Sequence, residues 1–349
     1  MQTSLTTMAR RLFLDRQAQF WADELGTVWS ATEPRARVVD IIDETRDVKT
    51  FVLRPNRRWR GHRAGQYTTV TVAIDGVNVR RCYSIASAPG EDHIAITIKR
   101  GRPGGVSSRL HTNVRRGHVL RLGDASGDFV LPDPAPRRLL LLSGGSGITP
   151  VMAILRDLAR RDAVSDVVFA HYARSRDDVI FGDELSALAA RHRGLRLFLG
   201  LSSENGRFDE GRLAEEIPDL RERATFLCGP EGLMARVDDM WKRAGATLVR
   251  ERFAAPTLTA PSAGGSVTVG LARSGRSVAA RASATLLDEL ERGGERPRHG
   301  CRIGICRTCT CRKHHGTVEN LVTGAVSSAP DEEIQLCVSV ARSDVELGL

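Results

Sequence analysis

The chain has 349 residues, of which 41% are hydrophobic and 27% are charged, and it carries a net charge of +9. This length predicts two or three domains, and the composition is typical of a soluble globular protein. The longest strongly apolar run, near Leu139–Leu142, falls far short of the ~20 residues that a membrane span needs. The N-terminus has basic residues but no continuous apolar segment, so we expect no secretory signal and a cytoplasmic location.

The positive charge raises the question of nucleic-acid binding. Its excess is mostly arginine, scattered through the first three-quarters of the chain, with one local cluster at residues 57–63. Because no helix-turn-helix, zinc-finger or aromatic RNA-binding pattern accompanies it, nucleic acid is not an expected partner. We interpret the charge as serving phosphate-rich cofactors or an acidic partner.

Residues 1–34 are predicted to form a helical extension. Apolar side chains recur there at roughly helical spacing, among them Leu14, Trp21, Leu25 and Trp29. Two roles are open for such a helix, which can pack against the next domain or dock on a membrane surface or partner protein.

Residues 35–135 consist of short segments in which apolar and polar side chains alternate, separated by turns such as Asp75-Gly76. This pattern favours an antiparallel β-barrel. The expected strands are Ala36–Val39, Val48–Leu53, Tyr67–Val72 and His93–Ile98.

In residues 136–253 strands alternate with helices, which predicts a parallel, doubly wound α/β sheet. The expected strands are Leu139–Ser143, Val167–His171, Leu195–Leu201 and Ala224–Cys228. The expected helices are Pro150–Arg160, Phe181–Arg191 and Glu231–Ala244.

A linker rich in Pro, Ala, Ser and Gly covers residues 254–264 and leads to a last domain, residues 265–349. Ser266–Leu271 and Ser277–Arg281 are predicted to form a hairpin. Ser283 is the expected N-cap of a short helix that ends at Gly293-Gly294.

Four of the seven cysteines lie between residues 301 and 311, which does not resemble a disulfide framework. Cys301, Cys306, Cys309 and the distant Cys337 follow the C-x4-C-x2-C…C spacing of a plant-type [2Fe–2S] cluster. A zinc site is the alternative, since Cys306-x2-Cys309 is a zinc-like pair that Cys311 and His314-His315 can complete.

Two features in the barrel region suit a flavin. Arg81, Tyr83 and Ser84 end an expected strand and offer a cation for a phosphate, a ring for stacking and a small hydroxyl. A glycine-rich turn into a short helix follows, where free backbone N–H groups suit a pyrophosphate. The residues of this turn that we assign to the cofactor are Gly105, Val106, Ser107 and Ser108.

Two further glycine turns join strands to helices in the α/β region. The first differs from the G-x-G-x-x-G fingerprint of Rossmann dehydrogenases but occupies the same strand–turn–helix place. Its candidate nucleotide-binding residues are Gly144, Gly145, Gly147 and Thr149. The second turn is Cys228-Gly229-Pro230, at the carboxyl end of a strand, where open α/β sheets bind ligands.

In this order, Arg81-x-Tyr83-Ser84, the turn of residues 144–150 and Cys228-Gly229-Pro230 resemble the ferredoxin–NADP reductase superfamily. Together with the C-terminal cysteine pattern, the chain resembles the reductase components of oxygenases and acyl desaturases. The resemblance covers about residues 36–349. It implies a flavin-binding antiparallel β-barrel, an NAD(P)-binding doubly wound domain and an α+β, β-grasp ferredoxin domain.

The resemblance also implies residue roles. Arg81, Tyr83 and Ser84 hold the flavin, and Cys228 lies near the nicotinamide carbon that gives up hydride. Glu251 and Phe253 match the segment that approaches the flavin, so Ser84, Cys228 and Glu251 are the expected catalytic residues. Cys301, Cys306, Cys309 and Cys337 are the implied iron ligands, with no ligand role for Cys311. FAD is expected in preference to FMN.

The choice of coenzyme rests on Arg174, Ser175 and Arg176, after the second strand of the α/β region. Arginines there can hold a 2′-phosphate, whereas an acidic residue favours the free hydroxyl of NADH. We therefore expect NADPH in preference to NADH.

The implied activity is an NAD(P)H-dependent oxidoreductase that passes electrons through FAD and a [2Fe–2S] cluster to a partner. A non-haem iron acyl desaturase or hydroxylase is the first expected acceptor, and a Rieske ring-hydroxylating oxygenase is the second. A peripheral contact with a membrane-bound partner is compatible with the aromatic extension and the basic cluster at 57–63. A standalone diaphorase and a redox sensor are the remaining alternatives, and the oligomeric state is open.

Overall fold

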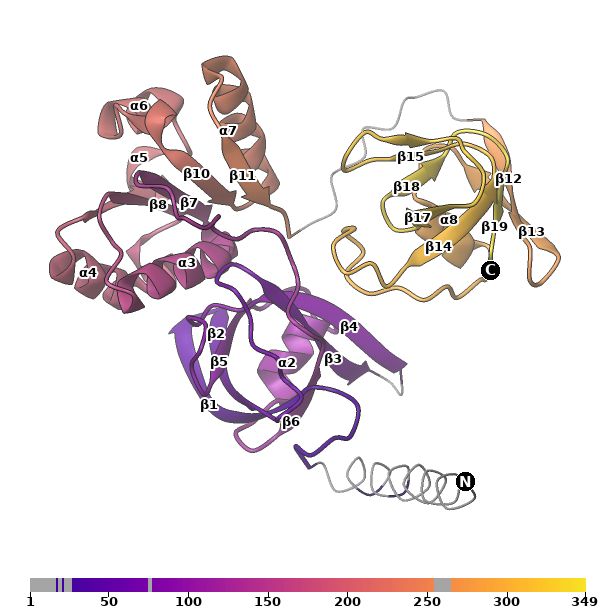
Figure 1. Cartoon of the computed structure of the whole chain (residues 1–349), viewed down its shortest axis with the longest axis horizontal. Coiled ribbons are helices and arrows are strands. Elements are labelled where there is room, and N and C mark those ends of the chain that lie inside the picture. Colours follow the sequence, from indigo (N-terminus) through magenta and orange to yellow (C-terminus); the bar gives the residue numbers. More distant parts are fainter. Residues whose placement is uncertain (1–16, 18–20, 22–26, 75–76, 254–264) are drawn as a thin grey trace, which may run out of the picture. The chain divides into compact units, whose positions relative to one another are not determined.

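The computed structural model describes residues 17, 21, 27–74, 77–253 and 265–349. The chain divides into two compact units, Met1–Glu251 and Arg252–Leu349 (Figure 1). The predicted linker, the Asp75-Gly76 turn and nearly all of the predicted N-terminal helix lie outside the described residues. Along the described stretches, no helix is long and apolar enough to cross a membrane.

The first unit begins with an antiparallel β-sheet in the strand order β4-β3-β6-β1-β2-β5. A bridge between Ile85 and Ile96 joins its two edges, so the sheet closes into the predicted barrel. Helix α2 (Val106–Asn113) contributes Val106 and Leu110 to the core of the barrel. The strands are β1 (Arg35–Thr45), β2 (Val48–Pro55), β3 (Tyr67–Ile74), β4 (Val77–Ser84), β5 (Ile94–Lys99) and β6 (Val119–Leu122).

The second half of the unit is an all-parallel sheet in the order β11-β10-β7-β8-β9. Its strands are β7 (Leu139–Gly144), β8 (Val167–Ala173), β9 (Leu195–Leu201), β10 (Ala224–Cys228) and β11 (Leu248–Glu251). The six residues of β7 are all buried, as the apolar run predicts. The strand order reverses between β7 and β10, which makes the carboxyl ends of these strands the topological switch point.

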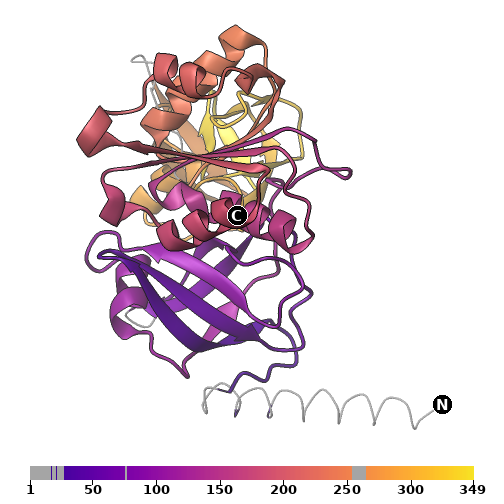
Figure 2. The same cartoon turned by 90° about the vertical axis from the view of Figure 1, so that its left-hand side faces the viewer.

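Helices cover both faces of this sheet (Figure 2). On the face toward the barrel, α3 (Ile148–Arg160) and α4 (Gly182–Arg191) share one apolar core with barrel residues such as Val48 and Phe129. On the other face, α6 (Glu210–Glu216) and α7 (Glu231–Ala244) enclose a second core. Four short helical segments lie in the connections between these strands and helices: η1 (Gly145–Gly147), η2 (Arg176–Asp178), α5 (Ser202–Asn205) and η3 (Leu220–Glu222).

Two predicted helix starts shift by one or two residues. Helix α3 begins at Ile148 rather than Pro150, which leaves the proline in the first turn, where its missing N–H costs nothing. Phe181 is not helical: it is the N-cap of α4 and adopts φ +60°, a left-handed conformation that is unusual for a bulky side chain.

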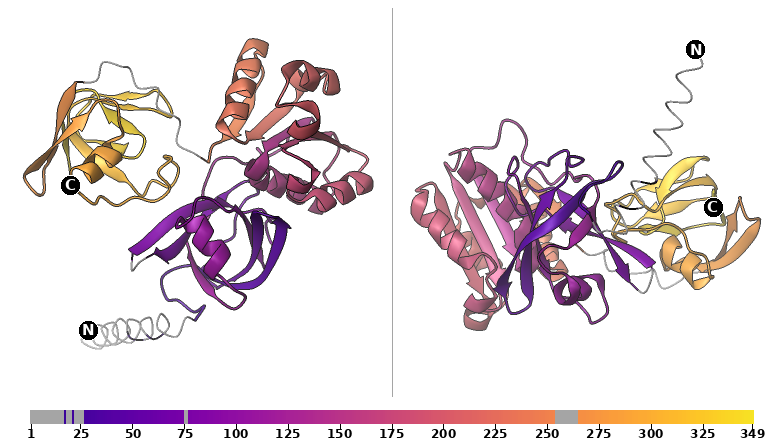
Figure 3. Two further views of the ribbon diagram at one scale, coloured as in Figure 1. Left: turned by 180° about the vertical axis from the view of Figure 1, so that it is seen from behind. Right: turned by 90° about the horizontal axis from the view of Figure 1, so that it is seen from below.

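The second unit holds a mixed sheet in the order β13-β12-β19-β14-β17, with a small sheet β16-β15-β18 (Figure 3). Helix α8 (Leu286–Arg292) packs Leu286, Leu287 and Leu290 into the core. The strands are β12 (Ser266–Leu271), β13 (Arg276–Arg281), β14 (Thr310–His315), β15 (Val318–Asn320), β16 (Val326–Ser327), β17 (Glu332–Gln335), β18 (Ser339–Ala341) and β19 (Val345–Leu347).

The predicted N-cap of α8 was wrong. The cap is Thr285 rather than Ser283, and its hydroxyl accepts a hydrogen bond from the N–H of Asp288 at 3.2 Å. The same hydroxyl donates to the Asp288 carboxylate at 2.7 Å, so the two side chains fix the first turn together. Ser283 offers the same hydroxyl chemistry but lies two residues too early. The predicted fold class is otherwise confirmed.

Candidate functional site

Three polar residues meet at the switch point of the parallel sheet. Cys228 ends β10 and lies directly between Ser143 of β7 and Glu251 of β11 in the strand register. Neighbours in register point to the same side of a sheet, so the three side chains share one face. All three are buried, with Cys228 and Ser143 fully so.

Ser84, at the end of barrel strand β4, reaches this row from the other half of the unit. Its hydroxyl donates to a carboxyl oxygen of Glu251 at 3.4 Å. Burial raises the pKa of Glu251 to about 8, so this carboxyl is protonated at neutral pH. Burial, together with the nearby Glu251, also raises the pKa of the Cys228 thiol. The structure thus brings the three expected catalytic residues together as uncharged polar groups.

A buried pair beside this row escaped the sequence analysis. Ser143 and His171 are neighbours in register, and the Ser143 hydroxyl lies 2.9 Å from Nδ1 of His171. Burial lowers the pKa of His171 to about 4, so the imidazole is neutral. Only strand pairing brings the two together, because 28 residues separate them in the sequence.

The expected flavin residues lie on strand β4 and helix α2. Arg81 and Tyr83 pair with Val70 and Thr68 of β3, and burial raises the pKa of the Tyr83 phenol. The first turn of α2 has no acidic residue and no side-chain cap within the described part of the chain. Its backbone N–H groups therefore suit an anion, as predicted for Gly105, Val106, Ser107 and Ser108.

Position 147 shows why the first nucleotide turn needs glycine. A Cβ atom on Gly147 would lie 2.2 Å from the carbonyl oxygen of Cys228 and 2.6 Å from the nitrogen of Gly229. The turns after β7 and β10 therefore touch backbone to backbone. Gly145 adopts φ +51°, and the Thr149 hydroxyl donates to the Ser146 carbonyl at 3.1 Å.

A pocket of about 510 Å³ opens at the carboxyl ends of β7, β8 and β9. Two of the residues predicted to bind the nucleotide, Gly144 and Pro230, line it, and Tyr172 and Phe208 form an aromatic wall. The basic residues that line it are Arg207 and Arg236.

The predicted coenzyme determinants lie outside that pocket lining. Arg174 is exposed, and the Ser175 hydroxyl donates to Asp178 at 2.8 Å. The Arg176 guanidinium lies 3.8 Å from Glu204 and is 76% exposed. Arg207 and Arg236 escaped the sequence analysis because they belong to an α5–α6 connection and a helix that carry no nucleotide-binding motif.

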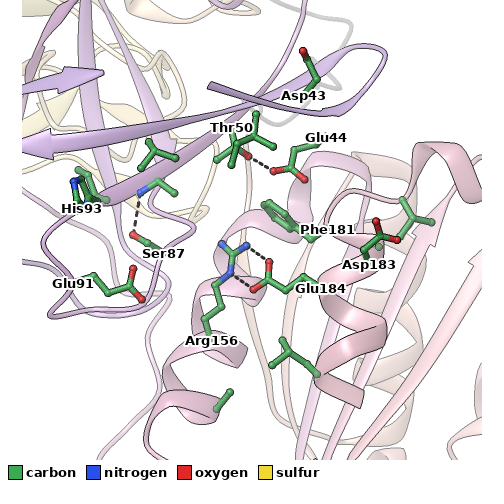
Figure 4. Close-up of a pocket in the computed structure, with 18 of the residues that line it drawn as sticks. Asp43, Glu44, Thr50, Ser87, Glu91, His93, Arg156, Phe181, Asp183 and Glu184 are labelled. Carbon is green, nitrogen blue, oxygen red and sulfur yellow. Dashed lines mark hydrogen bonds and ion pairs between the residues drawn. The ribbon is translucent and has the colours of Figure 1, made fainter. Parts of the chain in front are cut away.

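A larger pocket, of about 870 Å³, lies between strands β1, β2 and β5 of the barrel and helices α3 and α4 (Figure 4). Arg156 of α3 points into it and forms two hydrogen bonds with the carboxylate of Glu184, at 2.8 and 2.5 Å. The same guanidinium donates to the carbonyl of Ala86 in the barrel segment at 2.6 Å and lies 4.5 Å from the Phe181 ring centroid. Arg156 therefore ties the two halves of the first unit together.

The expected iron ligands lie on the loop that precedes β14 and on the segment after β17. The N–H groups of Ile303 and Cys306 point at the Cys301 sulfur, at 3.4 and 3.3 Å. The N–H of Cys301 points at the Cys306 sulfur at 3.2 Å. Such hydrogen bonds stabilise thiolates, so the loop fits an anionic iron–sulfur cluster.

Cys309 and Cys337 meet from distant parts of the sequence. A hydrogen bond between the two side chains lowers the pKa of Cys309 to about 7 and raises that of Cys337. The charge of Cys301 raises the pKa of Cys337 as well, so the fourth cysteine lies near the loop that carries the other three.

The alternative zinc ligands do not converge. Cys311 points into the apolar core, where burial raises its pKa, and its neighbours in the strand are exposed. His314 lies on the opposite face of β14 and contacts Asp331 at 2.7 Å. Phe253 is 40% exposed at the start of the second unit, and its predicted role near the flavin stays a prediction.

Three family models match consecutive parts of the chain. An oxidoreductase FAD-binding domain matches residues 35–130, an oxidoreductase NAD-binding domain matches 141–239, and a 2Fe-2S iron-sulfur cluster binding domain matches 269–342. These matches confirm the predicted FAD, nicotinamide nucleotide and [2Fe–2S] cofactors.

Whole-chain relatives show the same organisation. An NADPH oxidoreductase of Mycobacterium tuberculosis is 41% identical over 92% of this chain and 86% of the relative. A glycine betaine monooxygenase reductase subunit of Pseudomonas aeruginosa is 31% identical over 91% of this chain and 95% of the relative. The structure of phthalate dioxygenase reductase superposes with a TM-score of 0.62 at 25% identity, covering 90% of this chain and 97% of that one. The chain belongs to the ferredoxin–NADP reductase superfamily, as an NAD(P)H-dependent oxidoreductase with a C-terminal [2Fe–2S] ferredoxin domain.

Proposed function

We propose that this chain is the reductase component of a two-protein system and supplies single electrons to a separate non-haem iron oxygenase or desaturase. The observation that carries the proposal is the presence of two sites in one chain. The group formed by Ser84, Cys228 and Glu251 can receive a nicotinamide. The loop with Cys301, Cys306 and Cys309, together with Cys337, can hold a one-electron carrier. When bound, FAD accepts electrons in a pair and releases them singly to the cluster.

Each part of the first unit has a task in this scheme. Arg81 and Tyr83 bind and orient the flavin, while Gly105 to Ser108 hold its pyrophosphate through backbone N–H groups. Gly144 to Thr149 would receive the nicotinamide nucleotide, and the buried, uncharged thiol of Cys228 would line the end of the site that takes its ring. Ser84 and protonated Glu251 would place uncharged hydrogen-bonding groups between the flavin and nicotinamide sites.

The acceptor is the finer part of the proposal. The names of two similar proteins, glycine betaine monooxygenase reductase subunit and phthalate dioxygenase reductase, support an oxygenase. An acyl desaturase or hydroxylase is the second candidate, supported by the aromatic N-terminal sequence and the basic stretch at 57–63. A standalone diaphorase has no use for the ferredoxin domain.

The electron path is tested by replacing one ligand. Cys306→Ser is expected to abolish reduction of cytochrome c by NADPH and to leave reduction of ferricyanide, which can take electrons from the flavin, largely intact. Cys311→Ser is the matched control and should retain both activities with an unchanged iron content. Loss of both activities in Cys306→Ser, with flavin content unchanged, would refute the modular path.

We also propose NADPH as the coenzyme, which the name of the M. tuberculosis relative supports. Arg207 and Arg236 line the pocket at the strand ends, so they join Arg174 and Arg176 as candidates for holding the 2′-phosphate. Arg207→Ala should raise the KM for NADPH roughly tenfold or more, the loss of one charge-assisted bond, without changing the KM for NADH. If Arg176→Ala alone produces this selective change, the determinant is the one predicted from the sequence.

A further inference from the structure

The charge of the second unit is unevenly distributed along its sequence. Residues 252–349 contain 12 basic and 10 acidic side chains. Between residues 296 and 317 lie six of the basic residues and none of the acidic ones. This stretch contains Cys301, Cys306 and Cys309, so positive charge is concentrated around three of the expected cluster ligands.

Two of these six basic side chains are engaged within the unit. Arg302 forms an ion pair with Glu291 at 2.5 Å. Lys313 is fully buried, and its ammonium group donates to the carbonyls of Gly316 and Ala329, at 2.9 and 2.5 Å. Neither side chain is available to an outside partner.

The other four basic side chains form what we call the arginine face. They are exposed, and the structure gives them no ion pair with any residue that it describes. They are Arg296, Arg298, Arg307 and Arg312.

The backbone places this face at the cluster loop. Arg307 lies between Cys306 and Cys309 and adopts φ +52°, so the chain turns at that residue. In β14, Cys311 is buried while Thr310 and Arg312 are exposed, which puts Arg312 on the outward side of the strand. A protein that approaches the loop closely enough to accept an electron therefore meets Arg307, and beside it Arg312, whose register neighbour on β17 is the exposed Glu333.

The net charge of the first unit has the same sign as that of the arginine face. Residues 1–251 contain 39 basic and 32 acidic side chains, so the first unit is itself positive. An exposed arginine binds a carboxylate strongly, because its planar fork can form two parallel hydrogen bonds with it. A membrane or nucleic acid is also anionic but has no centre that accepts an electron.

We propose that the arginine face docks an electron-accepting protein whose own redox centre is surrounded by Asp and Glu. This inference rests on the proposed function, because it takes the cluster loop as the point where electrons leave the chain. Opposite charges on the two proteins accelerate their encounter and orient it, and salt weakens both effects.

Two forms of one acceptor test the proposal with full-length protein that carries its cofactors. Native cytochrome c is basic, and succinylation converts its lysines to carboxylates without changing the haem. Each NADPH supplies two electrons, which reduce two ferric haems to ferrous ones, and NADP⁺ and one proton are released. The dissociation constant of each form for the oxidised enzyme, measured by calorimetry, gives a readout that does not depend on turnover.

At low ionic strength the kcat/KM for the succinylated form should be about tenfold or more above that for the native form. The dissociation constant of the succinylated form should also be the lower of the two. The difference should vanish near 0.5 M salt, as expected for screened charges. The double variant Arg307→Glu/Arg312→Glu should reverse the preference in both readouts, and the corresponding Gln variant should abolish it.

The matched control is Arg191→Glu/Arg193→Glu, which changes the net charge equally. Arg191 ends helix α4 and Arg193 follows it, and both are exposed at the amino-terminal edge of the parallel sheet. This variant should keep the preference for the succinylated form. If both double variants behave alike, the effect is one of total charge and the docking face is refuted.

The variants also separate this inference from the proposed function. Anaerobic NADPH should bleach the cluster absorbance equally in the wild type and in both double variants, and iron content should be unchanged. If NADPH fails to bleach the wild-type cluster, the proposed electron path is wrong. If bleaching is normal but the preference does not respond to residues 307 and 312, only the docking face is wrong. Loss of binding to anionic lipid vesicles, with cytochrome preference unchanged, would assign the arginines to a membrane and refute the protein partner.

Discussion

Two polar contacts between the barrel and the α/β layer of the first unit have opposite character. At the α3–α4 side, Arg156 bonds to Glu184 and to the Ala86 carbonyl with short, charge-assisted hydrogen bonds. At the strand-end side, a single long bond of 3.4 Å joins Ser84 to the neutral carboxyl of Glu251. The strong contact lies away from the expected chemistry and the weak one lies within it. The difference indicates that the first holds the two halves together, while the second can yield to an entering nicotinamide.

Removing Arg156 should produce the largest loss of stability. Arg156→Ala leaves the Ala86 carbonyl and the partly buried Glu184 carboxylate without their partner, which should cost about 2–4 kcal/mol of unfolding free energy. The measurement is urea unfolding of the full chain followed by release of flavin fluorescence. Arg161→Ala, which removes the exposed arginine of an i,i+4 pair with Asp157, is the control and should cost less than about 1 kcal/mol. Equal losses in the two variants would mean that the α3–α4 contact does not hold the halves together.

Removing the Ser84 hydroxyl should have the reverse profile. Ser84→Ala loses only one long hydrogen bond, so unfolding should change by less than about 1 kcal/mol. The rate of flavin reduction by NADPH, followed by stopped-flow absorbance, should fall about tenfold or more because a group that orients the flavin is gone. Ser186→Ala, on the exposed side of α4, serves as the control for the same chemical change. A large stability loss with an unchanged rate would assign Ser84 a structural role.

A third test concerns the pH dependence of stability. The pKa of Glu251 is about 8 in the folded chain against an ordinary value of 4.5, so the folded state holds this proton more tightly than the unfolded state does. Its stabilising contribution is complete below pH 4.5 and is lost as the pH rises to about 8. Relative to Glu251→Gln, the wild type should therefore lose melting temperature over this range, by roughly 2–4 °C for each kcal/mol. A constant difference between the two proteins would mean that Glu251 is ionised throughout.

The sequence predicted correctly those structural features that depend only on residues close together in the chain. The strand–turn–helix at 139–160 and the cysteine spacing at 301–309 are continuous in sequence, and their chemistry is evident from residue types alone. The short strand β6 was missed because it has only four residues, one of them Arg121, and owes its pairing to β1 and β3.

The parts that were missed at the candidate site depend on pairing between distant segments. The buried Ser143–His171 contact exists only because β7 and β8 are in that register. The sequence around Arg156 indicates only a helix, because its hydrogen bond to the Ala86 carbonyl depends on how the barrel packs against that helix. Likewise, Arg207 and Arg236 reach one pocket from separate elements, whereas Arg174 and Arg176 follow the strand in sequence but lie outside the pocket lining.

The backbone contact of Gly147 with Cys228 and Gly229 limits how this enzyme can be altered. Since the two turns touch with no side chain between them, a change in the shape of one displaces the other. Exchanging the first turn for that of a relative, as a means of altering coenzyme use, should therefore succeed only when the second turn is transferred with it. In evolution and in protein engineering alike, the two turns therefore have to be exchanged together, although about 80 residues of sequence separate them.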